Sequence, residues 1–120
     1  MTKWVDVRLV YDTKAQPLSS GVRAVLQRAR RLLYAADETE LVLQIAPGKQ
    51  AERFTLAGQM LEIGTPVEGA RVKLQGPEGD VHETTDEEGE FQIGALLRGS
   101  YSLEVESPER LIRTLPLEVE

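Results

Sequence analysis

Catalytic chemistry has few candidate residues in this chain, because it contains one histidine, His82, and no cysteine. Nucleophilic hydrolysis requires a base such as histidine within hydrogen-bond reach of a serine or threonine. His82 lies between Val81 and Glu83 in a short strand-like run, where a surface histidine is the simpler interpretation. The lack of cysteine excludes disulfides, thiolate metal sites and iron–sulfur clusters. We therefore expect neither enzyme activity nor a cofactor.

A second group with chemical potential is acidic and falls between positions 80 and 90. Its members are Asp80, Glu83, Asp86, Glu87, Glu88 and Glu90. Carboxylates are ligands of Ca²⁺, but their spacing here does not match an EF-hand loop. An acidic strand edge also discourages aggregation between strands. The sequence favours a solvated edge and leaves Ca²⁺ binding open.

The third group is basic and lies near the N-terminus. Residues 1–36 carry a net charge of +5 and residues 37–120 carry −11, within an overall −6. The candidate partner-binding residues are Arg23, Arg28, Arg30 and Arg31. Neither a recognisable docking element nor stacking aromatics accompany them, so nucleic-acid binding is not expected. The basic segment is predicted either to dock on the acidic remainder or to bind a protein partner.

The elements that position these groups begin with a short strand over residues 5–10, where apolar and polar side chains alternate. A break at residues 14–17 follows. Apolar residues then recur at three-to-four spacing from Gly21 to Tyr34, which predicts an amphipathic helix with arginines on its other side. Because Gly21 weakens a helix, an irregular basic linker remains the alternative.

From Glu40 onward the periodicity changes to two residues, and short strands recur between Gly- and Pro-containing turns. This spacing is typical of an all-β sandwich. No stretch approaches membrane-spanning length, and Asp6 and Arg8 interrupt any signal-peptide core. We expect a cytoplasmic protein that does not bind a membrane, or a fragment of a longer protein whose other part carries its targeting.

Four sequence motifs in this region occur together in a known order. They are Gly58-Gln59-Met60-Leu61, residues 65–74, Thr84-Thr85-Asp86-Glu87-Glu88-Gly89-Glu90-Phe91, and residues 97–105. The chain thereby resembles the carboxypeptidase regulatory-like domains. The resemblance implies a Greek-key, seven-stranded, transthyretin-like sandwich over residues 40–120, preceded by a strand and a basic amphipathic segment over residues 1–39. Within it, Asp86 and Gly89 are expected to serve a backbone turn.

A weaker resemblance extends over nearly the whole chain. The motifs that carry it are similar to the N-terminal parts of proteins encoded with bacterial sigma factors; they are Val7-Arg8-Leu9-Val10-Tyr11-Asp12, Gln16-Pro17, Gly21-Val22-Arg23, Arg31-Leu32-Leu33-Tyr34 and Leu43-Gln44-Ile45. Those proteins often carry a zinc-binding anti-sigma module, which this cysteine-free chain cannot form. The resemblance implies a role in transcriptional regulation.

Together these features predict a non-catalytic module that binds an unidentified protein partner, in sigma-factor regulation or another regulatory setting. One alternative is a structural accessory domain of a larger or secreted protein. Another is a carbohydrate-binding module, although Phe54, Phe91 and Tyr101 fall at core-facing strand positions and leave few aromatics for sugars. The oligomeric state stays open.

Overall fold

The computed structural model describes residues 4–12, 30–50, 52–108, 110–114 and 116–119, and every regular element in these ranges is a β-strand. In chain order they are β1 (Trp4–Asp12), β2 (Arg30–Ala36), β3 (Thr39–Pro47), β4 (Arg53–Glu62), β5 (Thr65–Pro66), β6 (Arg71–Gly76), β7 (Gly79–Thr84), β8 (Glu90–Leu97), β9 (Gly99–Glu106), β10 (Leu111–Thr114) and β11 (Leu117–Val119). The fold is mainly β, as the two-residue periodicity predicts.

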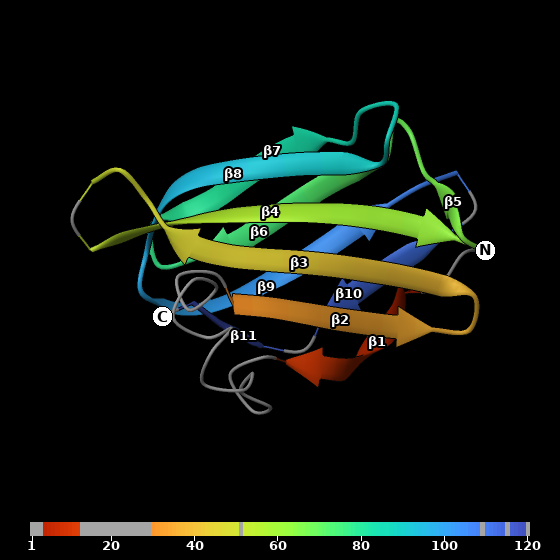
Figure 1. The fold of residues 1–120 in the computed structure, drawn as a ribbon, viewed down its shortest axis with the longest axis horizontal. Coiled ribbons are helices and arrows are strands. Elements are labelled where there is room, and N and C mark those ends of the chain that lie inside the picture. The colour runs from red at the N-terminus through yellow and green to blue at the C-terminus, as the bar shows by residue number, and fades with distance from the viewer. Residues whose placement is uncertain (1–3, 13–29, 51, 109, 115, 120) are drawn as a thin grey trace, which may run out of the picture.

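The strands form two layers (Figure 1). In the first layer β2, β3 and β4 pair in sequence, and the far edge of β4 pairs with β8 and then with the short β5. In the second layer β7, β6 and β9 are neighbours, and the far edge of β9 pairs with β11 and β10. The result is a β-sandwich.

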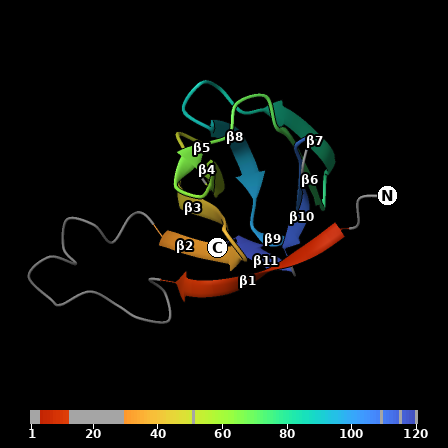
Figure 2. The same cartoon turned by 90° about the vertical axis from the view of Figure 1, so that its right-hand side faces the viewer.

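Strand β1 joins the two layers along one side. Its first part, Trp4–Val7, pairs in parallel with β10 of the second layer. Its second part, Arg8–Asp12, pairs antiparallel with β2 of the first layer, and a register shift lies between Leu9 and Tyr11. Figure 2 shows β1 crossing beneath both layers. One strand therefore carries backbone hydrogen bonds to both sheets and closes this side of the sandwich.

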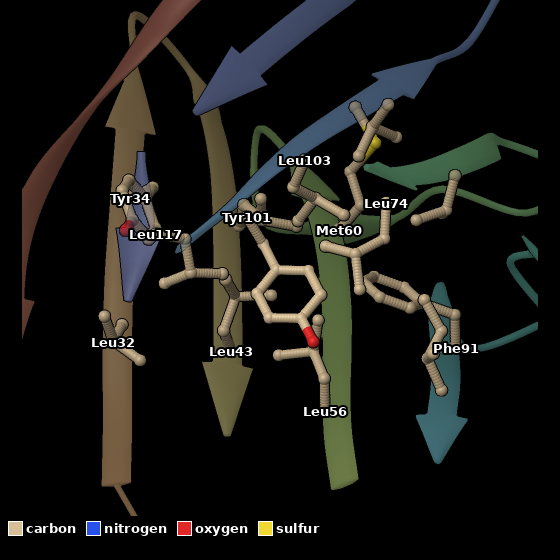
Figure 3. Close-up of a cluster of buried hydrophobic side chains, with 14 of the residues drawn as sticks. Leu32, Tyr34, Leu43, Leu56, Met60, Leu74, Phe91, Tyr101, Leu103 and Leu117 are labelled. Carbon is tan, nitrogen blue, oxygen red and sulfur yellow. The ribbon is translucent and has the colours of Figure 1, made fainter. Parts of the chain in front are cut away.

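The core fills the space between the layers because alternate side chains of each strand point inward. Figure 3 shows part of this cluster, in which Leu43, Leu56 and Met60 of the first layer meet Leu74 and Leu103 of the second. All five are fully buried. The predicted core positions around β6 are confirmed, since Ala70, Val72 and Leu74 are buried. The rings of Phe91 in β8 and Tyr101 in β9 are buried as predicted.

The predicted helix is wrong where the structure describes it. Residues from Arg30 onward form β2, which pairs with β3 in register from Arg30 and Ile45 to Ala36 and Thr39. Leu32 and Tyr34 are buried and Leu33 is half-buried, so the run has a strand's alternation. The same apolar residues satisfy helical spacing, and pairing with β3 decides between the two structures. The rest of the predicted helix lies outside the described residues.

The strand predicted over residues 5–10 is confirmed as β1. Eleven strands are described, rather than this strand and the seven of the expected sandwich, because β2 stands where the helix was predicted and β5 and β11 add short edge pairings. The predicted domain boundary, between residues 39 and 40, falls at the start of β3 in the β2–β3 hairpin. Val7 and Leu32, before that boundary, belong to the same buried cluster as the residues after it.

The turn between β7 and β8 has the backbone role predicted for it. The Asp86 carboxylate accepts hydrogen bonds from the backbone N–H groups of Glu88 and Glu90, at 2.9 and 3.0 Å. Gly89 has a φ of +73°, and a Cβ built there would lie 2.6 Å from the Met60 carbonyl oxygen. Both the backbone conformation and the close approach to β4 therefore require glycine.

This double requirement predicts the stability of two glycine variants. Gly89→Ala should lower the free energy of unfolding by about 3 kcal/mol, because it adds a backbone clash to an unfavourable φ. Gly64→Ala is the matched control, since φ is +75° there but an added Cβ has nothing within 4 Å. It should cost only about 1 kcal/mol. If urea unfolding shows the same loss of free energy for both variants, the close approach to Met60 adds nothing to the cost of Gly89→Ala.

Candidate protein-interaction site

Arg30, one of the predicted partner-binding residues, makes its hydrogen bonds within the chain. Its Nε and one terminal nitrogen donate to the two carboxylate oxygens of Asp12, at 2.9 and 2.7 Å. Its other terminal nitrogen donates to the backbone carbonyl of Glu118 at 2.6 Å. Arg30 therefore ties the end of β1 to the start of β2 and to β11, through the two-pronged geometry that arginine forms with carboxylates.

Of the other three predicted arginines, the structure describes Arg31 alone. Arg31 points to the outside of the first sheet, where it is exposed and paired in register with Gln44 of β3. Arg23 and Arg28 lie outside the described residues. Partner binding through these arginines stays a prediction.

Tyr34 lies inside the sheet close to this ion pair. Burial raises the pKa of its hydroxyl above the ordinary value of 10, while the positive charge of Arg30 opposes the rise and the negative charge of Asp12 adds to it. The neutral phenol is therefore the form that the fold favours.

The outer face of the second sheet carries charges that alternate across neighbouring strands. One row runs His82, Lys73, Glu104, Arg113, Asp6. Arg113 donates to Asp6 at 2.9 Å, and Lys73 lies 4.0 Å from Glu104. Opposite charges directly across a sheet stabilise each other, so this face is complementary to itself.

The outer face of the first sheet is different in kind. Across its centre lie side chains without charge, here called the uncharged face: Leu33, Val42, Gln44, Ala57, Gln59, Leu61 and Gln92. Strand alternation directs them outward, since their neighbours Leu32, Leu41, Leu43, Leu56 and Met60 are buried. In Figure 1 the strands of this face lie in front of β6, β9 and β10. Charged side chains such as Arg8, Arg31, Glu40 and Glu90 lie around it.

The uncharged face is hollowed at one end. The hollow has a volume of about 370 Å³ and is lined by Gln44, Ala46, Pro47, Gly48, Lys49, Thr55, Ala57 and Gln92. These residues come from β3, β4, β8 and the β3–β4 loop. Beside Val42, the Gln59 amide donates to the Glu88 carbonyl at 2.8 Å, which fixes the acidic turn beside β4.

This surface has the composition of a protein-contact region. Protein interfaces are depleted of charge at their centre and bounded by polar residues. Val42 is 36% exposed at the centre of the face and packs beside half-buried Leu33 in the adjoining strand. The arrangement supplies an apolar centre, amide hydrogen-bonding groups and a charged rim.

The residues considered from sequence for catalysis and metal binding lie on β7, in the turn after it and at the start of β8. His82 is exposed on β7, and its ladder partner is Lys73. Within the described ranges, no group of three or more His, Asp or Glu side chains is placed to hold a metal ion. The same part of the chain contains no helix that is long and apolar enough to span a membrane.

The uncharged face was missed by the sequence reasoning, although its signal is present. Val42 and Gln44 are the outward members of the alternating run in β3, and neither is charged. What the sequence alone does not provide is the register that aligns them with Ala57, Gln59 and Gln92 of other strands. The charge pattern pointed instead to the arginines. Of these, Arg30 is paired with Asp12, and partner binding through the arginines stays a prediction.

The geometry defines a class of protein, namely a two-layer β-sandwich. Comparison with known families makes this specific, because the model of the carboxypeptidase regulatory-like domain matches residues 55–120, more than half of the chain. The chain belongs to the carboxypeptidase regulatory-like domain family. Domains of this family are in general non-catalytic accessory or interaction modules. No curated protein and no solved structure shows significant similarity to the chain.

The largely buried Asp12–Arg30 ion pair should contribute more to the free energy of unfolding than the exposed Asp6–Arg113 pair, which also involves β1. Asp12→Ala should lower the free energy of unfolding by about 2 kcal/mol, because it leaves the largely buried Arg30 without its carboxylate. Asp6→Ala is the matched control on β1, since Asp6 and its partner Arg113 are exposed. Its cost should stay below about 1 kcal/mol. Chemical denaturation of both variants provides the measurement, and equal costs would contradict the argument.

Tyr34 predicts how stability changes at alkaline pH. Its pKa is raised in the folded chain, so its contribution is complete below the unfolded value and is lost as pH rises through the folded pKa. Urea unfolding from about pH 9 upward should show a decline above about pH 10 that is smaller in Tyr34→Phe. Ultraviolet titration should show one tyrosinate fewer at the alkaline end in that variant. An identical decline in both proteins would exclude Tyr34 as its source.

Proposed function

We propose that this protein is a non-catalytic interaction module that binds a partner protein through the uncharged face of its first sheet. One observation carries the proposal: the two outer faces of the sandwich have opposite chemistry. The second sheet pairs its own charges across strands, whereas the first exposes Val42, Leu33 and uncharged amides. A surface with an apolar centre gains more from being covered by a partner than a surface of paired charges.

A finer proposal places this interaction in bacterial sigma-factor regulation. Its support is the resemblance of residues 7–12 and 31–34 to proteins of that setting. These two motifs fall in β1 and β2, where Tyr11 and Leu33 are paired in register beside the uncharged face. A partner that covers the face would therefore also meet the outward residues of the motifs, including Arg31. The setting implies a cytoplasmic location.

The design of a test follows from the position of β1 and β2. A truncated chain beginning at Glu40 would lose Val7, Leu32 and Tyr34 from the core, so loss of binding by it would report unfolding. Point substitutions at exposed strand positions avoid this problem. Val42 and Gln75 are suitable because both are exposed in regular strands, one on each outer face.

The proposal predicts that Val42→Lys reduces capture of the partner at least tenfold, because it places a charge at the apolar centre of the contact. Gln75→Lys adds the same charge to the other face and should leave capture unchanged. Quantitative affinity capture, followed by binding titration with the captured protein and with a purified sigma factor, measures both effects. Equal binding by the two variants would show that the uncharged face is not the contact surface. If neither the wild type nor Gln75→Lys binds the sigma factor, the finer proposal is excluded and the proposed contact surface is not affected.

A further inference from the structure

Ile63 combines an unfavourable backbone conformation with an unfavourable exposure. It is 71% exposed, more than any other large apolar side chain in the described residues. It occupies the two-residue turn between β4 and β5, in which Glu62 pairs with Thr65. Its φ is +52° and that of Gly64 is +75°, the two consecutive positive values of a tight hairpin turn. Such turns favour Asn-Gly or Asp-Gly.

Both properties are unfavourable for the stability of the isolated chain in water. A β-branched residue at positive φ is strained, and an exposed isoleucine orders water around its apolar surface. The neighbouring β2–β3 turn shows the usual solution, since Asp37 occupies its positive-φ position, with a φ of +54°. Strained positions often mark functional contacts. An apolar side chain at such a position suggests that another molecule buries it in a complex.

The residues around Ile63 are linked by hydrogen bonds and carry net negative charge. Its backbone N–H donates to the Glu38 carbonyl at 2.9 Å, which ties the two turns together. Arg110 donates to Glu62 at 3.2 Å and to Asp37 at 3.5 Å. The three carboxylates of Asp37, Glu38 and Glu62 against one guanidinium leave a charge of −2 around the isoleucine. We call these five residues the turn tip.

A surface of complementary character lies on the same molecule. The residues that line the hollow in the uncharged face include the small side chains of Ala46, Ala57 and Thr55, and Lys49 is the charged residue among them. Arg31 lies beside the hollow, in register with Gln44. The hollow and the turn tip lie toward opposite ends of β4, and the six to eight residues from Thr55 and Ala57 to Ile63 span about 20 to 26 Å. One molecule therefore cannot bring the two surfaces together, but two molecules can.

We propose that Ile63 of one copy of this chain inserts into the hollow of a second copy, with the acidic turn tip against the basic rim. This inference rests on the proposed function, because it uses one end of the same face and names a second copy as its occupant. The two surfaces are different, so each pairing leaves a free turn tip on one copy and a free hollow on the other. Contacts of this kind add further copies in a row unless the geometry closes a ring.

The first test compares the wild type with Ile63→Asn by sedimentation velocity up to about 1 mM. The wild type should sediment faster as its concentration rises, and added salt should reduce this effect because the contact includes opposite charges. Ile63→Asn should remain monomeric. Its melting temperature, measured where both proteins are monomeric, should rise by about 4 °C because asparagine suits the turn. Loss of association then cannot be attributed to unfolding.

The second test separates the two surfaces. Ala57→Glu fills the hollow with a bulky acidic side chain and should also be monomeric, whereas Gln75→Glu, on the other sheet, should associate like the wild type. An equimolar mixture of Ile63→Asn and Ala57→Glu retains one intact turn tip and one intact hollow. The mixture should therefore form dimers and nothing larger.

A wild type that stays monomeric throughout, association that survives Ile63→Asn, or a mixture that forms no dimers would each overturn the inference. These results are distinguishable from failure of the proposed function. If Val42→Lys still abolishes capture of a different protein while the wild type is monomeric, the face binds that protein and the second copy is excluded.

Discussion

The hydrogen bonding of β1 to both sheets is the constraint on which the rest of the structure depends. Its first part adds to β10 and its second part adds to β2, so the two layers cannot slide or separate along this side without breaking a ladder. The Arg30 guanidinium holds the same corner, since it joins Asp12 at the end of β1 to the backbone of β11. The opposite side of the sandwich is bounded by β7 and β8, which are not paired with each other.

This closure explains why the two outer faces can differ so strongly. Each sheet has one face committed to the core, and the outer face needs only to remain compatible with water. In the second sheet that need is met by Lys73, Glu104 and Arg113, whose charges neutralise one another across strands. In the first sheet the outward positions lack that pattern, and the proposed function explains the difference by contact with a partner protein. Under that proposal, fold stability and recognition belong to different residues of the same strands.

The sequence was informative where local chemistry decides the structure. The Asp86–Gly89 turn, the inward residues of β6 and the buried rings of Phe91 and Tyr101 follow from turn chemistry and two-residue alternation. It was misleading around Leu32 and Leu33, where apolar residues fit both helical and strand spacing and the decision comes from pairing with β3. The candidate site depends on register between strands far apart in sequence, which no local pattern contains. Ile63 was detectable in principle, as an isoleucine before glycine where a tight turn favours asparagine.

The pairing of β1 with β10 also sets an order of events during synthesis. Trp4 pairs with Leu111 and Val7 with Thr114, so β1 is made 107 residues before its parallel partner. At about 5 to 20 residues per second, a ribosome needs on the order of 5 to 20 s to deliver that partner. During this interval β1 must remain unpaired on one side or rest on β2 alone. Completion of the sandwich thus waits for β10, and the nascent chain exposes apolar strand surface until that strand emerges.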